Sequence, residues 1–470
     1  MNGHAAGTWT RGAPARSLVT LLATAFLASM LVALPSEAAE TPVTIAGLIA
    51  RAAPGDTVVV PPGTYREQLV IEKLIVLAGE GRAVIDGGGR GDVVRILAGG
   101  VTLRGFTIQG SARDVVDEPA AVRVLADRAT IEDNRVRDAL YGIVTEDSRG
   151  HRILRNHVSS FLDFGPERRG HALYLWHSDD SVVEGNTVRG AKDGVFLGFA
   201  SHNRVERNHV SETRYAIHYM YADHNAFIDN VFRDSVAGGA IMFSRDITFR
   251  GNEFAYNRSA ASGYGLLFKD VDDVVMEDNR VHHNRLGITL EGAPLAPGAT
   301  VTLRHNFVGF NDVAIEIATT TAVTFTDNTF TGNLEQVVTT GHGNGRNVWS
   351  RDGRGNYWDD YQGYDADRDG VGDIPFQYDG AFDDLARREE WVRAYAFTPA
   401  RLALDLAARW FPAFRPAPSV VDPHPLVQPT MRLEAGAPGA GRALDVLALA
   451  VMAGLPLTWW RVSGRRAARW

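Results

Sequence analysis

The chain of 470 residues contains no cysteine. This excludes a disulfide framework and any site that uses a thiolate as nucleophile or metal ligand. Charged residues make up 22% of the chain and the formal net charge is −8, which argues against a nucleic-acid partner. The 48 glycines and the many short β-branched runs are typical of a turn-rich, all-β protein.

Long hydrophobic runs are confined to the two ends of the chain. The first extends from Leu18 to Leu34, follows two arginines, and is followed by Ser36-Glu37-Ala38. A basic segment, an apolar run and small residues at a cleavage site predict a secretory signal peptide over residues 1–38. A retained membrane anchor is the alternative.

The second run, Leu444 to Trp460, has 17 residues and would be about 26 Å long as a helix. That length is near the lower limit for crossing a bilayer core, and the four arginines after it suit a cytoplasmic tail. Asp445 and Pro456 interrupt the run, so a helix at the membrane interface or against a transporter is the alternative. The sequence therefore predicts a periplasmic protein with membrane association through its C-terminus.

Between these ends the most regular feature is an asparagine repeat. An apolar residue, two others, Asn, one other and then Val or Phe recur nine times, with the asparagines 22 to 30 residues apart. The nine are Asn134, Asn156, Asn186, Asn208, Asn230, Asn252, Asn279, Asn306 and Asn328. A repeat of this length is typical of a solenoid, whose units bury their apolar faces only by stacking.

The spacing within the repeat indicates which solenoid. Its two apolar residues are five apart, yet both must point inward, so the strand must bend between them. We expect Asn to occupy the bend in a left-handed conformation and its amide to bond to the Asn of neighbouring coils. These features predict a right-handed, single-stranded parallel β-helix of about a dozen coils.

A second strand follows in each coil, with an inward aliphatic residue nine positions after Asn, such as Ile143, Val195 and Ile217. Three coils depart from this offset: eight extra residues precede Leu173, two precede Ile241 and five precede Leu266. We interpret the extra residues as loops. The expected organisation is a signal peptide (1–38), the β-helix (39–350), an acidic cap or loop (351–382), a helical segment (383–412), a Pro/Gly-rich linker (413–442) and a membrane helix (443–461).

The outward positions of this second strand are unusually apolar for a surface that should be polar. One expected column contains Val144, Tyr174, Phe196, His218, Met242 and Leu267, and its neighbour contains Glu146, Trp176, Gly198, Met220, Ser244 and Lys269. Because adjacent coils lie about 4.8 Å apart, we expect His218 to contact Met242, with Met220 beside them. Imidazole and thioether are ligands that Cu(I) prefers when thiolate is absent.

Three interpretations of this stripe remain open. The alternatives are a protein-docking surface, a metal site, and a core stripe that is covered by the insertion Ser159–Arg169. The predicted surface comprises Tyr174, Trp176, Phe196, His218, Met220 and Met242, with His171, His177 and His224 as accessory ligands.

A separate candidate site lies after the repeats. Asp365, Asp367, Asp369 and Asp373 alternate along a loop turned at Gly370, a pattern of oxygen ligands that suits Ca²⁺. Phe376 stands where an EF-hand has its bidentate Glu. The alternative is a cap, rich in Asx turns, that closes the solenoid.

Several blocks resemble the NosD family of periplasmic nitrous oxide reductase maturation proteins. They are Tyr215–Tyr221 (YAIHYMY), Ala261–Val271 (ASGYGLLFKDV), and Asn356-Tyr357-Trp358 with Tyr364–Asp367. The resemblance implies a non-enzymatic accessory protein that handles copper transiently. It would work with an ABC transporter permease and its ATPase, and with a lipoprotein copper chaperone, to supply copper to nitrous oxide reductase.

A different class of function also fits a parallel β-helix, namely a polysaccharide lyase, hydrolase or uronate epimerase. Such sites need carboxylates and a base that converge on the outer surface. The sequence predicts no acidic cluster in the middle of the outward columns, because Asp179, Asp180 and Asp193 fall at expected turns. Fold alone does not decide between these functions.

Overall fold

The computed structural model describes residues 43–260, 262–319, 322–343, 347–378, 382, 385, 389–395, 398–411 and 418–433. The predicted signal peptide (1–38) and the predicted membrane segment (444–460) lie outside these residues. Within the described ranges, no helix is both long enough and apolar enough to cross a membrane.

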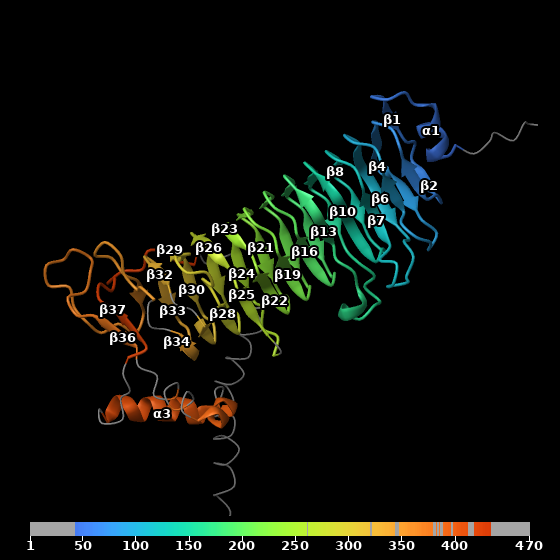
Figure 1. The fold of residues 1–470 in the computed structure, drawn as a ribbon. Helices are drawn as coiled ribbons and strands as arrows, with labels where there is room; N and C mark the ends of the chain where they lie inside the picture. Colours follow the sequence, from blue (N-terminus) through green and yellow to red (C-terminus); the bar gives the residue numbers. More distant parts are fainter. Residues whose placement is uncertain are drawn as a thin grey trace, which may run out of the picture. The chain divides into compact units, whose positions relative to one another are not determined.

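The described chain winds into a right-handed parallel β-helix, whose coils follow one another in sequence order (Figure 1). One sheet takes one strand from each coil, twelve in the described residues, which confirms the predicted number of coils. Its strands are β3 (Leu69–Ile71), β5 (Val94–Ile96), β7 (Ala120–Val124), β10 (Tyr141–Arg149), β13 (Leu173–Asp179), β16 (Asp193–Gly198), β19 (Tyr215–Met220), β22 (Ala237–Met242), β25 (Tyr264–Lys269), β28 (Leu286–Glu291), β31 (Val313–Thr319) and β34 (Glu335–Gly343).

The other long sheet contains 23 described strands, mostly two short ones from each coil on either side of the bend. They are β1 (Thr57–Val59), β2 (Gly63–Tyr65), β4 (Val76–Asp86), β6 (Thr102–Gln109), β8 (Thr130–Glu132), β9 (Arg135–Val136), β11 (Arg152–Leu154), β12 (His157–Val158), β14 (Val182–Glu184), β15 (Thr187–Arg189), β17 (Arg204–Glu206), β18 (His209–Ser211), β20 (Ala226–Ile228), β21 (Val231–Arg233), β23 (Arg245–Arg250), β24 (Glu253–Ala255), β26 (Asp272–Glu277), β27 (Arg280–His282), β29 (Val301–Arg304), β30 (Phe307–Gly309), β32 (Val323–Thr326), β33 (Thr329–Thr331) and β35 (Tyr357–Trp358).

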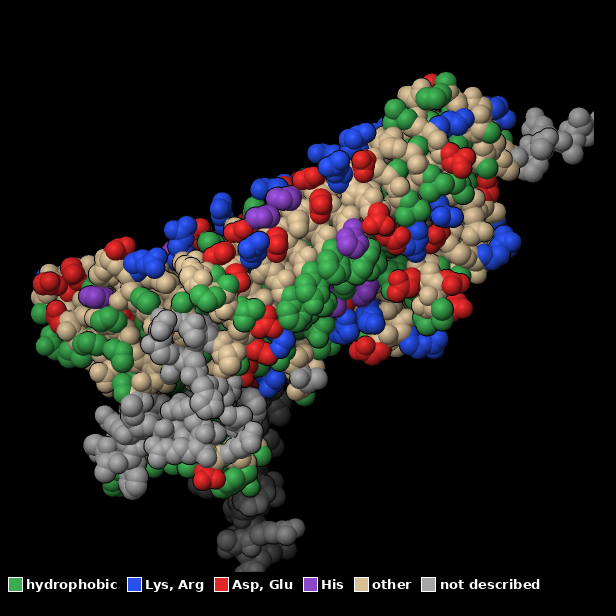
Figure 2. Space-filling model, viewed as in Figure 1, with side chains coloured by type: hydrophobic (Ala, Val, Ile, Leu, Met, Phe, Trp, Pro, Cys, Tyr) green, Lys and Arg blue, Asp and Glu red, His purple; other side chains and the backbone are tan. Residues whose placement is uncertain are grey.

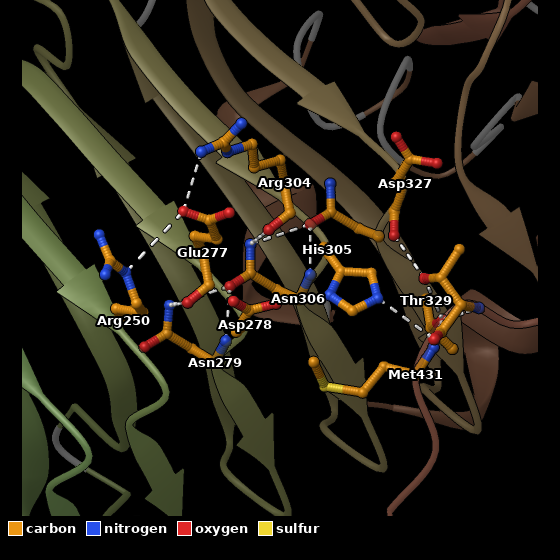
Figure 3. Close-up of polar contacts among 12 residues, drawn as sticks. Arg250, Glu277, Asp278, Asn279, Arg304, His305, Asn306, Asp327, Thr329 and Met431 are labelled. Carbon is orange, nitrogen blue, oxygen red and sulfur yellow. Dashed lines mark hydrogen bonds and ion pairs between the residues drawn. The ribbon is translucent and has the colours of Figure 1, made fainter.

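The asparagines form a continuous buried ladder through this second sheet. Asn208 is representative: its Nδ2 donates to Val183 O (2.8 Å) and to Asn230 Oδ1 (2.9 Å), and its Oδ1 accepts from the backbone N and Nδ2 of Asn186. The ladder begins where Phe106 N donates to Asn134 Oδ1 and ends at Asn356. Figure 3 shows two of its rungs, Asn279 and Asn306. Each coil is therefore bonded to the next through identical buried amides.

The expected conformation of these asparagines is wrong. The left-handed residue is the one before each Asn, for example Arg155 (φ 52°), Arg207 (φ 54°) and Asp229 (φ 53°). Because the chain bends one residue earlier, the Asn side chain points into the solenoid. There it satisfies backbone groups of the preceding coil and bonds to the amide of the next Asn, as Asn208 does with Val183 O, Asn186 N and Asn230 Oδ1.

The core consists of inward columns that stack from coil to coil. One runs through Ile131, Ile153, Val183, Val205, Phe227, Phe249 and Met276, all fully buried. Phe227 and Phe249 lie parallel at 4.9 Å. The helix α1 (Ile45–Arg51), capped by Thr44, packs Ile45 and Ile49 against the first coils.

The C-terminal end of the core is closed by stacked aromatic rings. Trp349 stacks on Phe325 at 4.1 Å, and Trp358 lies between Phe330 and Phe376 at 4.4 and 4.5 Å. Beyond this cap the described residues include the helical segments η2 (Glu390–Tyr395) and α3 (Pro399–Trp410). Arg401 of α3 forms an ion pair with Glu335 of the last coil.

Residues 418–433 fall in the predicted linker, but they pack against the last coils. Strand β37 (Val420–Asp422) pairs antiparallel with β36 (Phe376–Tyr378). The buried Asp422 accepts hydrogen bonds from Asn356 N (2.7 Å) and Trp358 Nε1 (3.0 Å), so it terminates the asparagine ladder. Farther along, Met431 N donates to Thr329 Oγ1 (Figure 3).

Candidate functional site

At β22, the residues that lie in each outward column of the twelve-stranded sheet differ from those predicted from the sequence. Met220 pairs with Met242, and His218 pairs with Ala240. The expected contact between His218 and Met242 in one column is therefore wrong, and so is the place given to Ser244. The cause is Gly239, which occupies the inward position beside Ile217, where an aliphatic residue was expected. Leu266 fills the space, since a Cβ on Gly239 would lie 2.6 Å from its Cδ1.

A charged cluster centred on Asp193 lies at the start of these strands. The Asp193 side chain is fully buried in β16, and its carboxylate accepts from Arg214 Nε (2.9 Å), Arg214 Nη2 (2.6 Å) and His218 Nδ1 (2.8 Å). His171 Nδ1 lies 3.2 Å from the same oxygen, at an angle that makes no hydrogen bond. The sequence analysis placed Asp193 at a turn because its partners lie on the two neighbouring coils, His171 before β13 and Arg214 and His218 at β19.

The electrostatics of the cluster follow from burial and pairing. Burial alone would raise the pKa of Asp193, but the contacts with His171, His218 and Arg214 outweigh it and hold that pKa far below its usual range. Burial lowers the pKa of His171 below its ordinary value, although the Asp193 carboxylate opposes this shift. A carboxylate only accepts, so Nδ1 of His218 carries the proton, and in the neutral ring Nε2 keeps a free lone pair.

The insertion Ser159–Arg169 covers one end of the predicted stripe. Phe161 belongs to one buried cluster with Val144 and Tyr141, and both Phe164 and Tyr174 pack against that cluster. Val144 is fully buried, so the covered-core interpretation holds at that end. Phe196 is also buried, whereas Trp176, Met220 and Met242 are half-buried.

A row of aromatic side chains continues this apolar surface. Phe199, Tyr221 and Phe243 follow directly after β16, β19 and β22, and His177 occupies the equivalent position within β13. The four rings stack at 4.9, 5.1 and 5.1 Å. All four have left-handed backbones, with φ between 46° and 53°. The equivalent residues of the flanking coils are Asp147 and Asp270, which tolerate that conformation better.

Three of these aromatic residues are substantially exposed: Phe199 at 42%, Tyr221 at 48% and Phe243 at 36%. Figure 2 shows the resulting hydrophobic band over β13, β16, β19 and β22. We call the whole surface the aromatic–thioether face, defined as Tyr174, Trp176, Phe196, His218, Met220 and Met242 together with His177, Phe199, Tyr221 and Phe243. The sequence analysis missed the last three aromatic residues, although their common position after each strand was a usable signal.

The family is decided by comparison with known proteins. A model described as periplasmic copper-binding protein (NosD) matches residues 161–363, and a model of a family of unknown function matches residues 38–226. A "probable ABC transporter binding protein NosD" from Pseudomonas aeruginosa is 31% identical, over 90% of this chain and 99% of that protein. The chain belongs to the NosD family. A protein of the same description from Stutzerimonas stutzeri is 30% identical, over 79% of this chain and 87% of that protein.

Several solved structures with a partly similar fold are named as enzymes that act on polysaccharides. They include the A-module of mannuronan C-5 epimerase AlgE6 from Azotobacter vinelandii, with a TM-score of 0.44 and 16% identity, over 63% of this chain and 91% of that one. An alginate lyase from Paenibacillus has a TM-score of 0.36 and 13% identity, over 64% and 94% of the two chains. Likeness at this level carries no information about activity. The NosD match, by contrast, spans the entire aromatic–thioether face.

The remaining predicted residues lie elsewhere in this NosD-family chain. His224 stacks on His202 at 4.8 Å and lies 3.2 Å from Asp246, at a different turn of the coils. The ligand atoms of Asp365, Asp367 and Asp369 lie within 4.8 Å of one another. Their carboxylates accept backbone N–H groups of their own loop, and Asp373 accepts from Ala366 N. Calcium binding there stays a prediction.

Proposed function

We propose that this chain is a non-enzymatic accessory protein of the periplasm that helps supply copper for the maturation of nitrous oxide reductase. In this role it works with an ABC transporter permease and its ATPase, and with a lipoprotein copper chaperone. The names of the family model and of the two relatives support a copper-handling, transporter-associated role.

The observation that carries the proposal is the aromatic–thioether face. Large aromatic residues in left-handed turns cost backbone strain, and strain of this kind clusters at functional sites. Exposed apolar patches bordered by polar residues mark places where partners bind, and tyrosine, tryptophan and methionine are enriched there. We therefore assign partner docking to this face.

The same face offers ligands suited to copper. Met220, Met242 and His218 present thioether and imidazole groups, which bind Cu(I) in a chain without cysteine. A docked chaperone would place its own copper next to these groups.

The Asp193 cluster does not favour a polysaccharide-active enzyme. A glycosidase needs a carboxylic acid that donates a proton, and therefore one with a raised pKa. The pKa of Asp193 is instead held low by two histidines and Arg214, and its side chain is fully buried. Incubating the purified mature protein with uronic-acid polymers tests this directly, and turnover there would replace the proposal.

The main test is maturation in the host. His218→Ala combined with Met242→Ala should leave the protein folded but lower the copper content of nitrous oxide reductase. The matched control is His224→Ala with Met431→Ala, which changes the same residue types outside the face and should leave copper content unchanged. Normal maturation with the first pair would show that the face has been wrongly assigned.

A further inference from the structure

We infer that helix α3 lies on the surface of a phospholipid membrane, with the side that carries Ala403, Leu406 and Trp410 in the lipid interface. The inference concerns a different part of the chain from the aromatic–thioether face and does not depend on copper. It assigns a lipid-binding role to a segment for which the sequence predicted only helical structure.

Helix α3 (Pro399–Trp410) turns its charged side toward the rest of the protein. Its charged residues stand at positions 401, 405 and 409, and residues four apart lie along one side of a helix. Of these three, the structure describes the side chain of Arg401, which is only 4% exposed. A helix on a protein surface ordinarily buries its apolar side and exposes its charged side. Helix α3 does the reverse.

Contacts on the inner side of α3 hold it in this orientation. The guanidinium of Arg401 forms an ion pair with the buried Glu335 of the last coil and lies over the ring of Phe382, 4.7 Å from its centroid. Leu404 packs against the buried pair Phe382 and Val392. Because breaking a buried ion pair is strongly destabilising, these contacts fix which side of α3 faces the solenoid.

The opposite side of α3 is apolar and exposed. Ala403, Leu406, Ala407 and Trp410 recur at spacings of three or four residues, so they form one continuous stripe. All four are exposed, Leu406 at 51% and Trp410 at 73%, and so is Phe411 directly after the helix. A stripe of this kind, on a helix that is held by its charged side, is suited to a hydrophobic environment outside the chain.

The exposed aromatic residues point to lipid as that environment. In η2, Trp391 is 67% exposed, and its ring contacts that of the exposed Tyr395 at 6.2 Å between centroids. The described tryptophans of the solenoid are instead half-buried or buried. Tryptophan and tyrosine are enriched at membrane–water interfaces, where the ring enters the lipid and the polar atom stays hydrated. An amphipathic helix with aromatic residues on its apolar side lies in the plane of such an interface.

The end of the described chain is held on the same coil as α3. Thr430 N donates to Thr329 Oγ1 (3.1 Å) in β33, and Glu335, the partner of α3, begins β34 of that coil. The predicted membrane segment, Leu444–Trp460, lies outside the described residues. Residues 434–443 connect it to the described chain, and ten residues extend over at most about 35 Å. A membrane that receives this segment therefore lies within reach of the coil that carries α3.

The absence of cysteine allows a single fluorescent label to test the inference. Ala403→Cys in the mature protein is labelled with NBD and mixed with vesicles of phosphatidylethanolamine and phosphatidylglycerol. We expect the emission to shift to shorter wavelength and to be quenched by lipids that carry a nitroxide on the acyl chain. The matched control is Val116→Cys, which is 81% exposed in the N-terminal half of the solenoid and should show neither change. Attachment through Leu444–Trp460 alone would leave both labels in water and would overturn the inference.

A second variant tests whether the apolar stripe makes the contact. Leu406→Glu with Trp410→Glu, added to the Ala403→Cys protein, should abolish the quenching and leave the unfolding midpoint unchanged, because both side chains are exposed. Undiminished quenching would contradict the role of the stripe. An emission shift without vesicles that grows with protein concentration would identify a second copy of the chain as the occupant. A shift only in vesicles that contain the transporter would identify the transporter, and either result would overturn the lipid inference.

Discussion

Two outward surfaces of the same solenoid present different kinds of side chain to water. On the 23-stranded sheet, exposed arginines pair with acidic residues of the preceding coil: Arg155 with Glu132 and Asp133, Arg207 with Glu184, and Arg304 with Glu277. On the twelve-stranded sheet between β13 and β22, the corresponding surface is aromatic and thioether. Both surfaces are built on equally regular strands.

The comparison separates what the fold requires from what it only permits. Ion pairs along exposed coils keep a solenoid soluble, and each contributes little to stability. An exposed row of aromatic residues in left-handed turns neither improves solubility nor avoids backbone strain. The difference therefore points to partner binding on one face and to a solvated surface on the other, and the following changes would break or sharpen it.

The largest effect is expected at the buried charge beneath the functional face. Asp193→Asn leaves Arg214 without its partner, and breaking a buried charge pair of this kind should destabilise the protein by about 3 kcal/mol. Arg155→Ala, at an exposed pair on the opposite sheet, should change stability by no more than about 0.5 kcal/mol. Urea unfolding of both variants measures the gap, and equal effects would contradict the contrast.

A smaller effect is expected inside the ladder that supports both faces. Asn208→Asp removes the two N–H donors that reach Val183 O and Asn230 Oδ1 and puts an anion beside those acceptors, so it should cost about 1–3 kcal/mol. A shorter ladder runs through Asn257, Asn284, Asn311 and Asn333. Asn333→Asp makes the same change at its partly buried end, where the cost should be lower. An unchanged melting temperature for Asn208→Asp would refute the ladder's contribution.

The aromatic row should matter for function far more than for stability. Phe199→Asp with Tyr221→Asp loses ring stacking worth about 0.5–1.5 kcal/mol per pair, but aspartate fits the left-handed turn better. The net change in stability should be within about 1 kcal/mol, while copper content of the reductase falls. A variant that melts far below the wild type would indicate that the row is structural.

The last comparison concerns the opposite pH dependences of two buried carboxylates. The pKa of Asp193 is lowered in the fold, so its contribution is present above the ordinary carboxyl pKa of about 3.9 and is lost as pH falls. Burial raises the pKa of Asp422 despite its hydrogen bonds. The contribution of Asp422 to stability is therefore present below the ordinary carboxyl pKa and is lost as pH rises through the raised pKa of the folded state.

Urea unfolding across the acidic range checks both signs. The stability of the wild type relative to Asp193→Asn should increase with pH, and its stability relative to Asp422→Asn should decrease. Parallel curves for the two variants would contradict a lowered pKa for Asp193 and a raised pKa for Asp422.

The sequence predicted those features that each coil repeats. The asparagine pattern recurs in every coil even where loops lengthen the coil, because each Asn makes the same hydrogen bonds. The fold could therefore be predicted from this pattern. The register at β22 could not be predicted, because the inward position there is Gly239 and not the expected apolar residue. The sequence places Asp193 at a turn and gives no sign of its role, since its partners reach it only when the coils stack. The bend was misplaced by one residue because an inward Asn and a left-handed Asn have the same spacing.

The most direct test of the central claim is a comparison of the two faces in the host. Nitrous oxide reductase is purified from cells complemented with a variant of one face or the other, and its copper is counted per monomer. Tyr221→Asp with Met242→Leu alters the aromatic–thioether face, and Arg155→Ala with Arg207→Ala alters the charged face. The account predicts copper-deficient reductase from the first and fully loaded reductase from the second. Fully loaded reductase from both, with both variants present and folded, would contradict it.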